Sequence, residues 1–571
     1  MPLMLRDGSI TYVDVFRPDV SDKFPALLSR IANNKSSQYG RFDDLDPIRA
    51  ASSGFAVVIQ DVRGRYSSDG DFYAFVNEID DGYDSIEWVA NQSWCNGRVG
   101  MYGRSYAGAS QWMAAKSRPK SLGCIAPGFT VSNYQDGWIW RRGAFELESN
   151  LSWTLGELTT GNWENLSRRL FIGHKYLDRL VIFNKEMQNN YKNILLEDIP
   201  EIRTLAPYYF DWLSHPEYDS YWERISIEES HSSIDIPSFN YGGWFDSRIG
   251  GTIRNYTRMS ELGGSEVARR GQRLLIGPWI NSGASYINSA ASRSYGVKRS
   301  IGDVDLHGQL LRYYDHWLKD QDNGVAEEKP VKLFVMGEDE WRFEEAWPLL
   351  QATEINYYIN SSGRANTLNG DGELTVELPH EAPPDVYVYN PIDPVPSVAG
   401  DICCDSAFLT SGTMDQRSIE VRHDVLVYTS SALERDTEIT GPVSMILYAS
   451  TSAVDTDFTV KLVDVSDCGC AMKIADGILR TRYQVMQEPG KLTNTGDVCE
   501  YNIDLSATSN IFKRGHKIRI EVSSSNFPKY DTNTNTGSDI VSSPNVVSAM
   551  QSIYHSTEYP SHIKLPFVQR D

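Results

Sequence analysis

The stretch Gly100–Gly108 constrains the fold of this chain more than any other segment. Residues 99–102 form a short apolar run that predicts a buried strand, and residues 111–116 predict a helix that follows it. Between them, Ser105 stands in a Gly-x-Ser-x-x-Gly pattern. This is a variant of the nucleophile elbow, in which glycines let a strand turn sharply into a helix. Serine and glycine also meet in plain turns, so the strand–turn–helix setting is what favours a nucleophile.

Strand and helix patterns alternate on both sides of this bend, which predicts an α/β fold. Residues 54–61 are nearly all apolar, as expected of a strand buried on both faces of a parallel sheet. The other predicted strands are 10–16, 24–28, 236–246 and 272–279, and the other predicted helices are 82–90 and 305–319.

The pattern changes twice along the chain. Residues 145–230 are helical in periodicity and rich in aromatics, which predicts a helical cap inserted over the site. After Pro330, short β-type runs separated by turn residues predict a β-sandwich or jelly roll. The predicted domains are therefore 1–144 and 231–329 for the α/β core, 145–230 for the cap and 330–571 for the β-sandwich.

Length, net charge and the distribution of apolar residues limit which partners and which cellular compartment we expect for this protein. A chain of 571 residues is too long for a single core. Its net charge of −22 argues against nucleic acid as a partner, because phosphate backbones require basic patches. No run reaches the length of a membrane span, and the first residues lack the pattern of a signal peptide. We expect a cytoplasmic protein with a small-molecule substrate, no membrane partner and no cofactor; a homodimer is an open alternative.

Three kinds of residue pattern suggest metal binding at first sight. Cys468-Gly469-Cys470 is too tight for an ordinary zinc knuckle and has no second ligand pair beside it, so reduced thiols are the better interpretation. Asp80, Asp81 and Asp84 lie at a predicted helix start, where acidic residues suit the helix dipole. Fragments near Asp455 and Asp531 lack the spacing of an EF-hand calcium loop. We predict no metal site.

Ordered motifs along nearly the whole chain resemble one family of enzymes. They are Arg6-Asp7-Gly8, Gln60-Asp61-Val62-Arg63-Gly64, Glu78-x-Asp80-Asp81-Gly82-Tyr83-Asp84, Trp94 to Met101, the Ser105 elbow, Gly243-Trp244-Phe245-Asp246, Gly277-Pro278-Trp279, Asp455 to Asp464 and Ser523 to Asp531. The chain resembles the cocaine-esterase/X-prolyl dipeptidyl-peptidase family of serine hydrolases, which includes glutaryl acylases and α-amino acid ester hydrolases. The resemblance implies an α/β-hydrolase core with an inserted helical cap and a C-terminal jelly roll.

The resemblance also assigns catalytic roles. It makes Ser105 the nucleophile and Asp246 the acid that orients a histidine base. The family expects that histidine two residues after Gly-Pro-Trp, where this chain has Asn281. An asparagine side chain donates and accepts hydrogen bonds but does not take a proton near neutral pH. We therefore expect poor hydrolysis.

The oxyanion hole departs from the family as well. One donor is the backbone N–H of Tyr106, at the N-terminus of the predicted helix. The other is a tyrosine hydroxyl in relatives, and an ungapped match places Asn33 there. The amide of Asn33 is able to donate to an oxyanion. If the match contained a gap, Tyr39 would supply the oxyanion hydroxyl instead. Lys35 matches the family without a gap, which disfavours this alternative.

Several other residues are candidates for the pocket. His231 and His307 are the least implausible replacement bases, although a surface or core role is the better interpretation for each of them. Arg248, with Arg104 and Arg141, has the chemistry to bind an acidic group, and pairing with local acids explains these arginines slightly better. The candidate aromatic wall is Trp138, Trp140, Trp153, Trp244 and Trp279, for which core packing is the alternative.

Three hypotheses about function remain open. The first is a serine-hydrolase-type acyl enzyme acting on an ester or amide of a small organic molecule, with hydrolysis impaired at position 281. The second is a natural family member repurposed for a non-hydrolytic reaction, such as a cyclisation, elimination or lyase step. The third is a non-catalytic binding protein, because fold alone does not guarantee chemistry.

Overall fold

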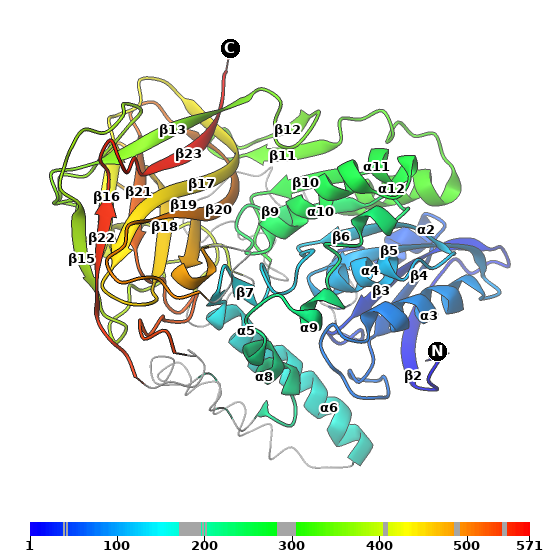
Figure 1. Ribbon diagram of the computed structural model, residues 1–571. Helices are drawn as coiled ribbons and strands as arrows, with labels where there is room; N and C mark the ends of the chain where they lie inside the picture. Colours follow the sequence, from blue (N-terminus) through cyan, green and yellow to red (C-terminus); the bar gives the residue numbers. More distant parts are fainter. Residues whose placement is uncertain are drawn as a thin grey trace.

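The computed structural model describes residues 1–37, 40, 44–170, 196, 199, 202–281, 304–402, 409–484, 491–538 and 545–570. Within them an α/β part, a group of helices and a β-rich C-terminal part pack together (Figure 1). No helix among these residues is both long and apolar enough to cross a membrane.

Among the described residues, a ten-stranded sheet forms the α/β part, in the order β1-β2-β4-β3-β5-β6-β9-β10-β11-β12. Its strands are β1 (Pro2–Met4), β2 (Ile10–Phe16), β3 (Phe24–Ile31), β4 (Ala56–Asp61), β5 (Cys95–Arg104), β6 (Leu122–Gly128), β9 (Phe239–Gly243), β10 (Arg273–Gly277), β11 (Val331–Val335) and β12 (Glu340–Glu344). The strands from β4 to β11 in this order run parallel, and β1, β2 and β12 are antiparallel at the edges.

Helices cover both faces of this sheet, which explains the apolar runs. In β4, Val57 and Ile59 pack with the helices α2 and α12, whereas Ala56 and Val58 pack with α3 and α4 on the opposite face. Successive residues of a strand point to opposite faces, so a strand covered on both faces must be apolar throughout. The helices are α2 (Pro47–Ser52), α3 (Glu78–Ala90), α4 (Tyr106–Lys116), α10 (Ile249–Leu262), α11 (Glu266–Arg270) and α12 (Leu306–Lys319).

The first sheet extends beyond the predicted boundary at residue 330. Strand β11 runs parallel to β10, with Leu274 opposite Val331, and β12 pairs antiparallel with β11. These two strands therefore belong to the α/β sheet rather than to the C-terminal part. Short β-type runs look the same in either sheet, so the sequence alone did not show which partner they would choose.

The cap is a layer of helices beside the carboxyl ends of the parallel strands (Figure 1). It comprises α5 (Leu147–Trp153), a π-helical turn η1 (Thr154–Leu158), α6 (Thr159–Leu170), α8 (Pro207–Ser214) and α9 (Ser220–Glu223). Its aromatic side chains share one buried cluster with Phe75 and Tyr106 of the α/β part. The cap is thus packed onto the region that contains the elbow.

The C-terminal part is a β domain around its own core, with eleven strands in the portion that the structure describes. Its strands are β13 (Ala352–Asn360), β14 (Glu373–Thr375), β15 (Asp385–Tyr389), β16 (Leu426–Ser430), β17 (Thr437–Thr451), β18 (Asp457–Val465), β19 (Ala471–Arg480), β20 (Cys499–Phe512), β21 (Lys517–Ser523), β22 (Ala549–Tyr554) and β23 (His562–Val568). It contacts the region before the cap through Asp531, whose Oδ1 accepts the N–H of Phe145 at 2.7 Å.

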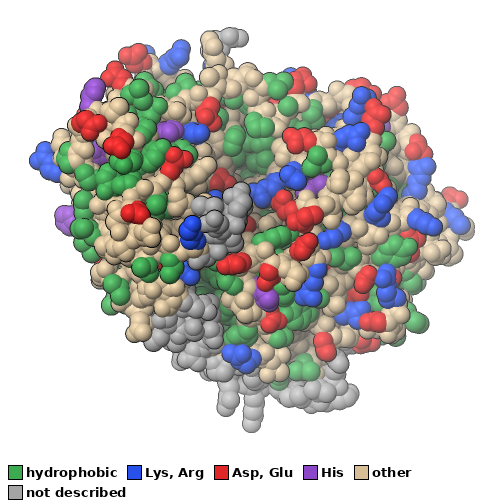
Figure 2. All heavy atoms as spheres, in the orientation of Figure 1, with side chains coloured by type: hydrophobic (Ala, Val, Ile, Leu, Met, Phe, Trp, Pro, Cys, Tyr) green, Lys and Arg blue, Asp and Glu red, His purple; other side chains and the backbone are tan. Residues whose placement is uncertain are grey.

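Charged side chains of both signs are interspersed over the face shown in Figure 2. Hydrophobic side chains gather mainly over the β-rich domain in that view. In this domain Val386 and Val388 of β15 and Met550 of β22 are exposed.

Candidate active site

Ser105 lies at a strained bend between β5 and α4. Its φ of 53° and ψ of −120° place a non-glycine residue in a region that side chains rarely adopt. The flanking glycines are required by close contacts. A Cβ atom added at Gly103 would lie 2.6 Å from the Cβ of Ala107, and one added at Gly108 would lie 2.6 Å from a main-chain oxygen of β6. The bend therefore has the geometry that the sequence pattern predicts.

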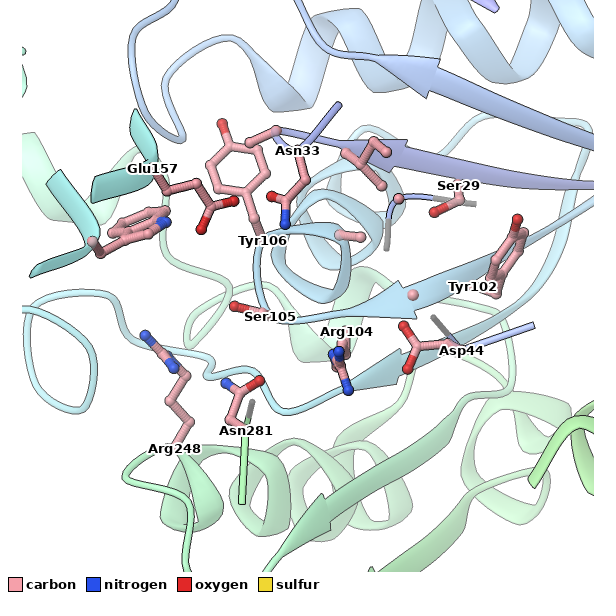
Figure 3. Close-up of a pocket in the computed structure, with 16 residues that line it drawn as sticks. Ser29, Asn33, Asp44, Tyr102, Arg104, Ser105, Tyr106, Glu157, Arg248 and Asn281 are labelled. Carbon is pink, nitrogen blue, oxygen red and sulfur yellow. The ribbon is translucent and has the colours of Figure 1, made fainter. Parts of the chain in front are cut away.

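The bend opens into a cavity that encloses about 700 Å³ of space, including its mouth. Ser105, Asn33 and Asn281 all line this cavity, and Figure 3 shows their side chains around one space. The other lining residues are Ser29, Ile31, Ala32, Gly40, Asp44, Tyr102, Gly103, Arg104, Tyr106, Ala107, Trp153, Glu157 and Arg248. The lining combines apolar side chains with a few convergent polar groups, as is usual in sites that bind small organic molecules.

The two predicted oxyanion donors flank the serine. Tyr106 is the first residue of α4, so its N–H is one of the donors that a helix start leaves without a main-chain partner. Its hydroxyl points the other way and donates to Glu78 Oε1 at 2.8 Å. Asn33 follows β3 and lines the cavity from the opposite side. Tyr39, the alternative donor, lies outside the described residues.

A buried arginine joins the Asn33 loop to the cap. Arg65 donates from Nε to the carbonyl of Ala32 at 2.7 Å, from Nη1 to that of Leu158 at 2.5 Å and from Nη2 to that of Glu157 at 3.1 Å. A Cβ atom at Gly161 would meet this guanidinium at 2.2 Å, so only glycine leaves room for it. Both walls of the cavity are thereby held by one side chain.

Asp246 is fully buried on the turn after β9 and is not among the residues that line the cavity. Neither of its carboxyl oxygens has a hydrogen-bond partner among the described residues, and neither has the Nδ2 of Asn281. The nearest ion-pair contact joins Asp246 Oδ1 to Arg248 Nη1 at 3.9 Å. Burial raises the pKa of Asp246 to about 7, and Arg248 opposes the rise. Asn281 therefore does not relay a hydrogen bond from Ser105 to this acid.

No described histidine lines the cavity. The Nε2 of His231 lies 3.1 Å from Asn255 Oδ1, and burial lowers its pKa. His307 Nδ1 accepts the backbone N–H of Asp46 at 3.3 Å. Both are engaged in local structure, as the sequence favoured.

The candidate pocket residues divide into two groups. Trp153 and Arg248 line the cavity. Trp138 lies behind them, with the Arg248 guanidinium 3.9 Å from its ring centroid and with Trp153 at a centroid distance of 5.7 Å. This cation–π contact aims the arginine along the cavity wall.

The structure places the remaining three tryptophans in packing roles. Trp140 packs on Phe145, Trp244 on Trp347 and Trp279 on Trp341. Trp140 and Trp244 donate their indole N–H groups to main-chain carbonyls. None of the three lines the cavity. Aromatic residues near a motif have the same spacing whether they form a wall or a core, so sequence did not separate them.

Two acids in the cavity wall carried no sequence signal. Glu157 belongs to the π-helical turn η1 of the cap. Asp44 lies beside Arg104, and burial raises its pKa while Arg104 and the hydroxyl of Tyr241 oppose the rise. Neither acid belongs to a recognisable motif, and only the folding of separate segments brings them to Ser105.

Arginine side chains form ion pairs with the clustered aspartates that resemble metal sites in the sequence. Arg6 pairs with Asp80 at 2.7 Å and with Asp84 at 2.9 Å. In the β domain, Arg480 pairs with Asp457 at 2.8 Å and with Asp531 at 3.0 Å. Among the described residues no group of three acidic, histidine or cysteine side chains is arranged to hold a metal ion.

A strained serine elbow under a helical cap, with an acid after a later strand, defines a serine-hydrolase-type α/β-hydrolase. Residues 7–282 match the model of the X-Pro dipeptidyl-peptidase (S15 family), and residues 323–564 match that of the X-Pro dipeptidyl-peptidase C-terminal non-catalytic domain. Cocaine esterase of Rhodococcus sp. (strain MB1 Bresler) is 36% identical over 578 residues, covering 99% of this chain and 97% of the relative. The chain belongs to this cocaine-esterase/X-Pro dipeptidyl-peptidase family of serine hydrolases.

Solved structures share the fold. An aminopeptidase from a marine sediment Thaumarchaeota archaeon aligns with a TM-score of 0.80 at 24% identity, over 99% of this chain and 95% of its own. An α-amino acid ester hydrolase aligns with a TM-score of 0.79 at 24% identity, over 99% and 96%. At this level of identity the likeness concerns architecture alone.

Proposed function

We propose that this chain is a serine-hydrolase-type acyl enzyme for an ester or amide of a small organic molecule, with hydrolysis impaired because position 281 is asparagine. The observation that carries the proposal is an interrupted relay: within the described residues, no chain of hydrogen bonds leads from Ser105 through position 281 to Asp246. Ser105 stands at an intact elbow, while the Asp246 carboxyl and the Asn281 Nδ2 lack partners among the described residues. A histidine at position 281 would offer a donor to that acid and an acceptor to the serine.

The remaining parts of the site have definable tasks. Ser105 attacks the acyl carbon, and the Tyr106 N–H with the Asn33 amide stabilises the oxyanion that forms. Arg248 lines the cavity, and in this proposal it binds an acidic or strongly polar group of the substrate. Asn281 contributes a hydrogen bond but accepts no proton, so both acylation and attack by water are slow.

A repurposed, non-hydrolytic enzyme is the second candidate. It is favoured by the amides of Asn33 and Asn281, which line the same cavity. The family resemblance implies a tyrosine hydroxyl and an imidazole at these two positions. Two polar groups that do not titrate suit a site that orients a substrate for cyclisation or elimination. A cytoplasmic location is part of the proposal, because free thiols are usual there. In the described part of the chain, the free cysteines are Cys95, Cys124, Cys468, Cys470 and Cys499.

Restoring the histidine tests the proposal. Asn281→His is expected to raise kcat/KM for p-nitrophenyl esters about 100-fold or more over the wild type, since a positioned general base contributes about that much. Asn281→Gln is the matched control, because it keeps the amide. Ser105→Ala should remove the gained activity.

The outcomes separate the candidates. If Asn281→His stays inert but gains turnover when combined with Asn33→Tyr, the oxyanion hole is the second defect. If both variants stay inert, the repurposed enzyme is favoured. A wild type that already hydrolyses esters as fast as Asn281→His would refute impairment.

A further inference from the structure

A carboxylate of the cap stands in the wall of the serine cavity. Glu157 lies on the π-helical turn η1, and π-turns within helices occur frequently at functional sites. Figure 3 shows its carboxylate directed into the cavity, on the side of Asn33 and across from Arg248 and Asn281. Ser105 therefore faces an acid that the interrupted relay does not use.

This carboxylate has no structural partner that explains its position. Its Oε1 is buried and makes no hydrogen bond to a described residue, and no ion pair joins Glu157 to another described side chain. The N–H groups of the nearby Arg65 donate hydrogen bonds to main-chain carbonyls, including that of Glu157 itself, and to the Asn162 side chain. Glu157 is partly exposed, and leaving its buried Oε1 without a partner costs free energy. Arg65 thus fixes the turn without a hydrogen bond or ion pair to the Glu157 carboxylate.

The surroundings tune this acid towards proton transfer. Burial raises the pKa of Glu157 above its ordinary value of 4.5, and the charges of Arg65 and Arg104 oppose the rise. The phenol of Tyr66 lies near enough to interact with it, and Asp44 and Arg248 are the other charged groups of the cavity. A carboxylate whose pKa is moved towards the working pH is a better general base.

We propose that Glu157 accepts the proton of Ser105 when the serine is acylated, in place of the absent histidine. This inference rests on the proposed function. The Oγ–H bond of Ser105 breaks and its proton passes to the Glu157 carboxylate, directly or through one water, while the Oγ–acyl bond forms. The bond from the acyl carbon to the leaving group then breaks, and Glu157 returns the proton to that group. Charge and atoms balance without a further reactant.

The mechanism predicts a sign for the pH dependence. Only ionised Glu157 accepts a proton, so the acylation rate of Ser105 rises as the pH passes upward through the pKa of Glu157 and is lost below it. The acylation rate should begin to rise at a higher pH than the titration range of an ordinary glutamate. A protein in which Asn281→His supplies the base would instead follow the titration of that histidine.

The test uses a fluorophosphonate probe on the full-length protein and measures both the saturating rate and the probe concentration at half-saturation. Glu157→Gln is expected to lower the saturating rate tenfold or more and to flatten its pH profile. Glu164→Gln is the matched control, since Glu164 is exposed seven residues further along the cap. Thermal unfolding should show that both variants are folded.

The outcomes distinguish this inference from the proposed function. If Glu157→Gln labels at the wild-type rate, or changes only the half-saturating concentration, Glu157 is not the base. In the Asn281→His background, Glu157→Gln should no longer slow labelling. If Ser105 is never labelled, even with Asn281→His, the proposed function fails and this inference fails with it.

Discussion

Replacing Asp246 by asparagine is expected to stabilise the folded protein above neutral pH, although the residue occupies the position of a catalytic acid. The side chain is fully buried, and its carboxyl oxygens have no hydrogen-bond partner among the described residues. Burial raises its pKa from 3.8 to about 7. The folded state therefore holds the proton more tightly than the unfolded chain.

The magnitude follows from this difference in pKa. Each tenfold change in proton affinity is worth about 1.4 kcal/mol, so ionising Asp246 in the folded state costs at most roughly 4 kcal/mol. Below about pH 4 both states are protonated and the cost is absent. As the pH rises from about 4 to about 7, the unfolded state ionises first and stability falls; above pH 7 the whole cost is present. Asp246→Asn removes this cost without changing the shape of the side chain.

Urea unfolding of the wild type and of Asp246→Asn at pH 5, 6, 7 and 8 measures the effect. The advantage of the variant should grow with pH and level off near pH 8. Asp385→Asn is the control of opposite sign. Burial of Asp385 favours a raised pKa, but the hydrogen bonds from His555, Ala365 N–H and Ser361 outweigh it and the pKa is lowered. That variant should be less stable than the wild type at pH 8.

One comparison would refute the reasoning directly. In the Asn281→His background the new imidazole offers a donor to the Asp246 carboxylate, so Asp246→Asn should no longer stabilise the protein. An advantage of Asp246→Asn that does not vary with pH, or a loss of stability at pH 8 in the wild-type background, would mean that the carboxylate already has a partner or water.

Two further predictions concern packing. Gly108→Ala places a Cβ atom 2.6 Å from the carbonyl oxygen of Gly128, so we expect a loss of about 1–3 kcal/mol in urea unfolding and loss of probe labelling; wild-type behaviour would mean that β6 moves away easily. Arg480→Met leaves the buried carboxylates of Asp457 and Asp531 unpaired, so we expect a loss of about 3–5 kcal/mol for the β domain in thermal unfolding; an unchanged transition would show that these acids are protonated or hydrated.

The sequence by itself determined the elbow and the buried strands on either side of it. Steric limits at Ser105 act between residues a few positions apart, so a short pattern of glycines carries them. The continuous apolar run of β4 likewise predicts a strand that is buried on both faces of the sheet, and it can be recognised from neighbouring residues alone. The consequence of Asn281 could also be predicted from the sequence, because an amide side chain does not accept a proton near neutral pH wherever it lies.

Only the tertiary structure decided which side chains meet. The cavity wall joins the loop after β3, the elbow, the π-turn of the cap and the residues after β10, and no local pattern encodes such a meeting. Trp153 lines it while Trp279 packs in the core, though both are tryptophans beside motifs. Glu157 and the unpaired carboxyl of Asp246 became visible for the same reason: a side chain's burial and partners are properties of the assembled chain.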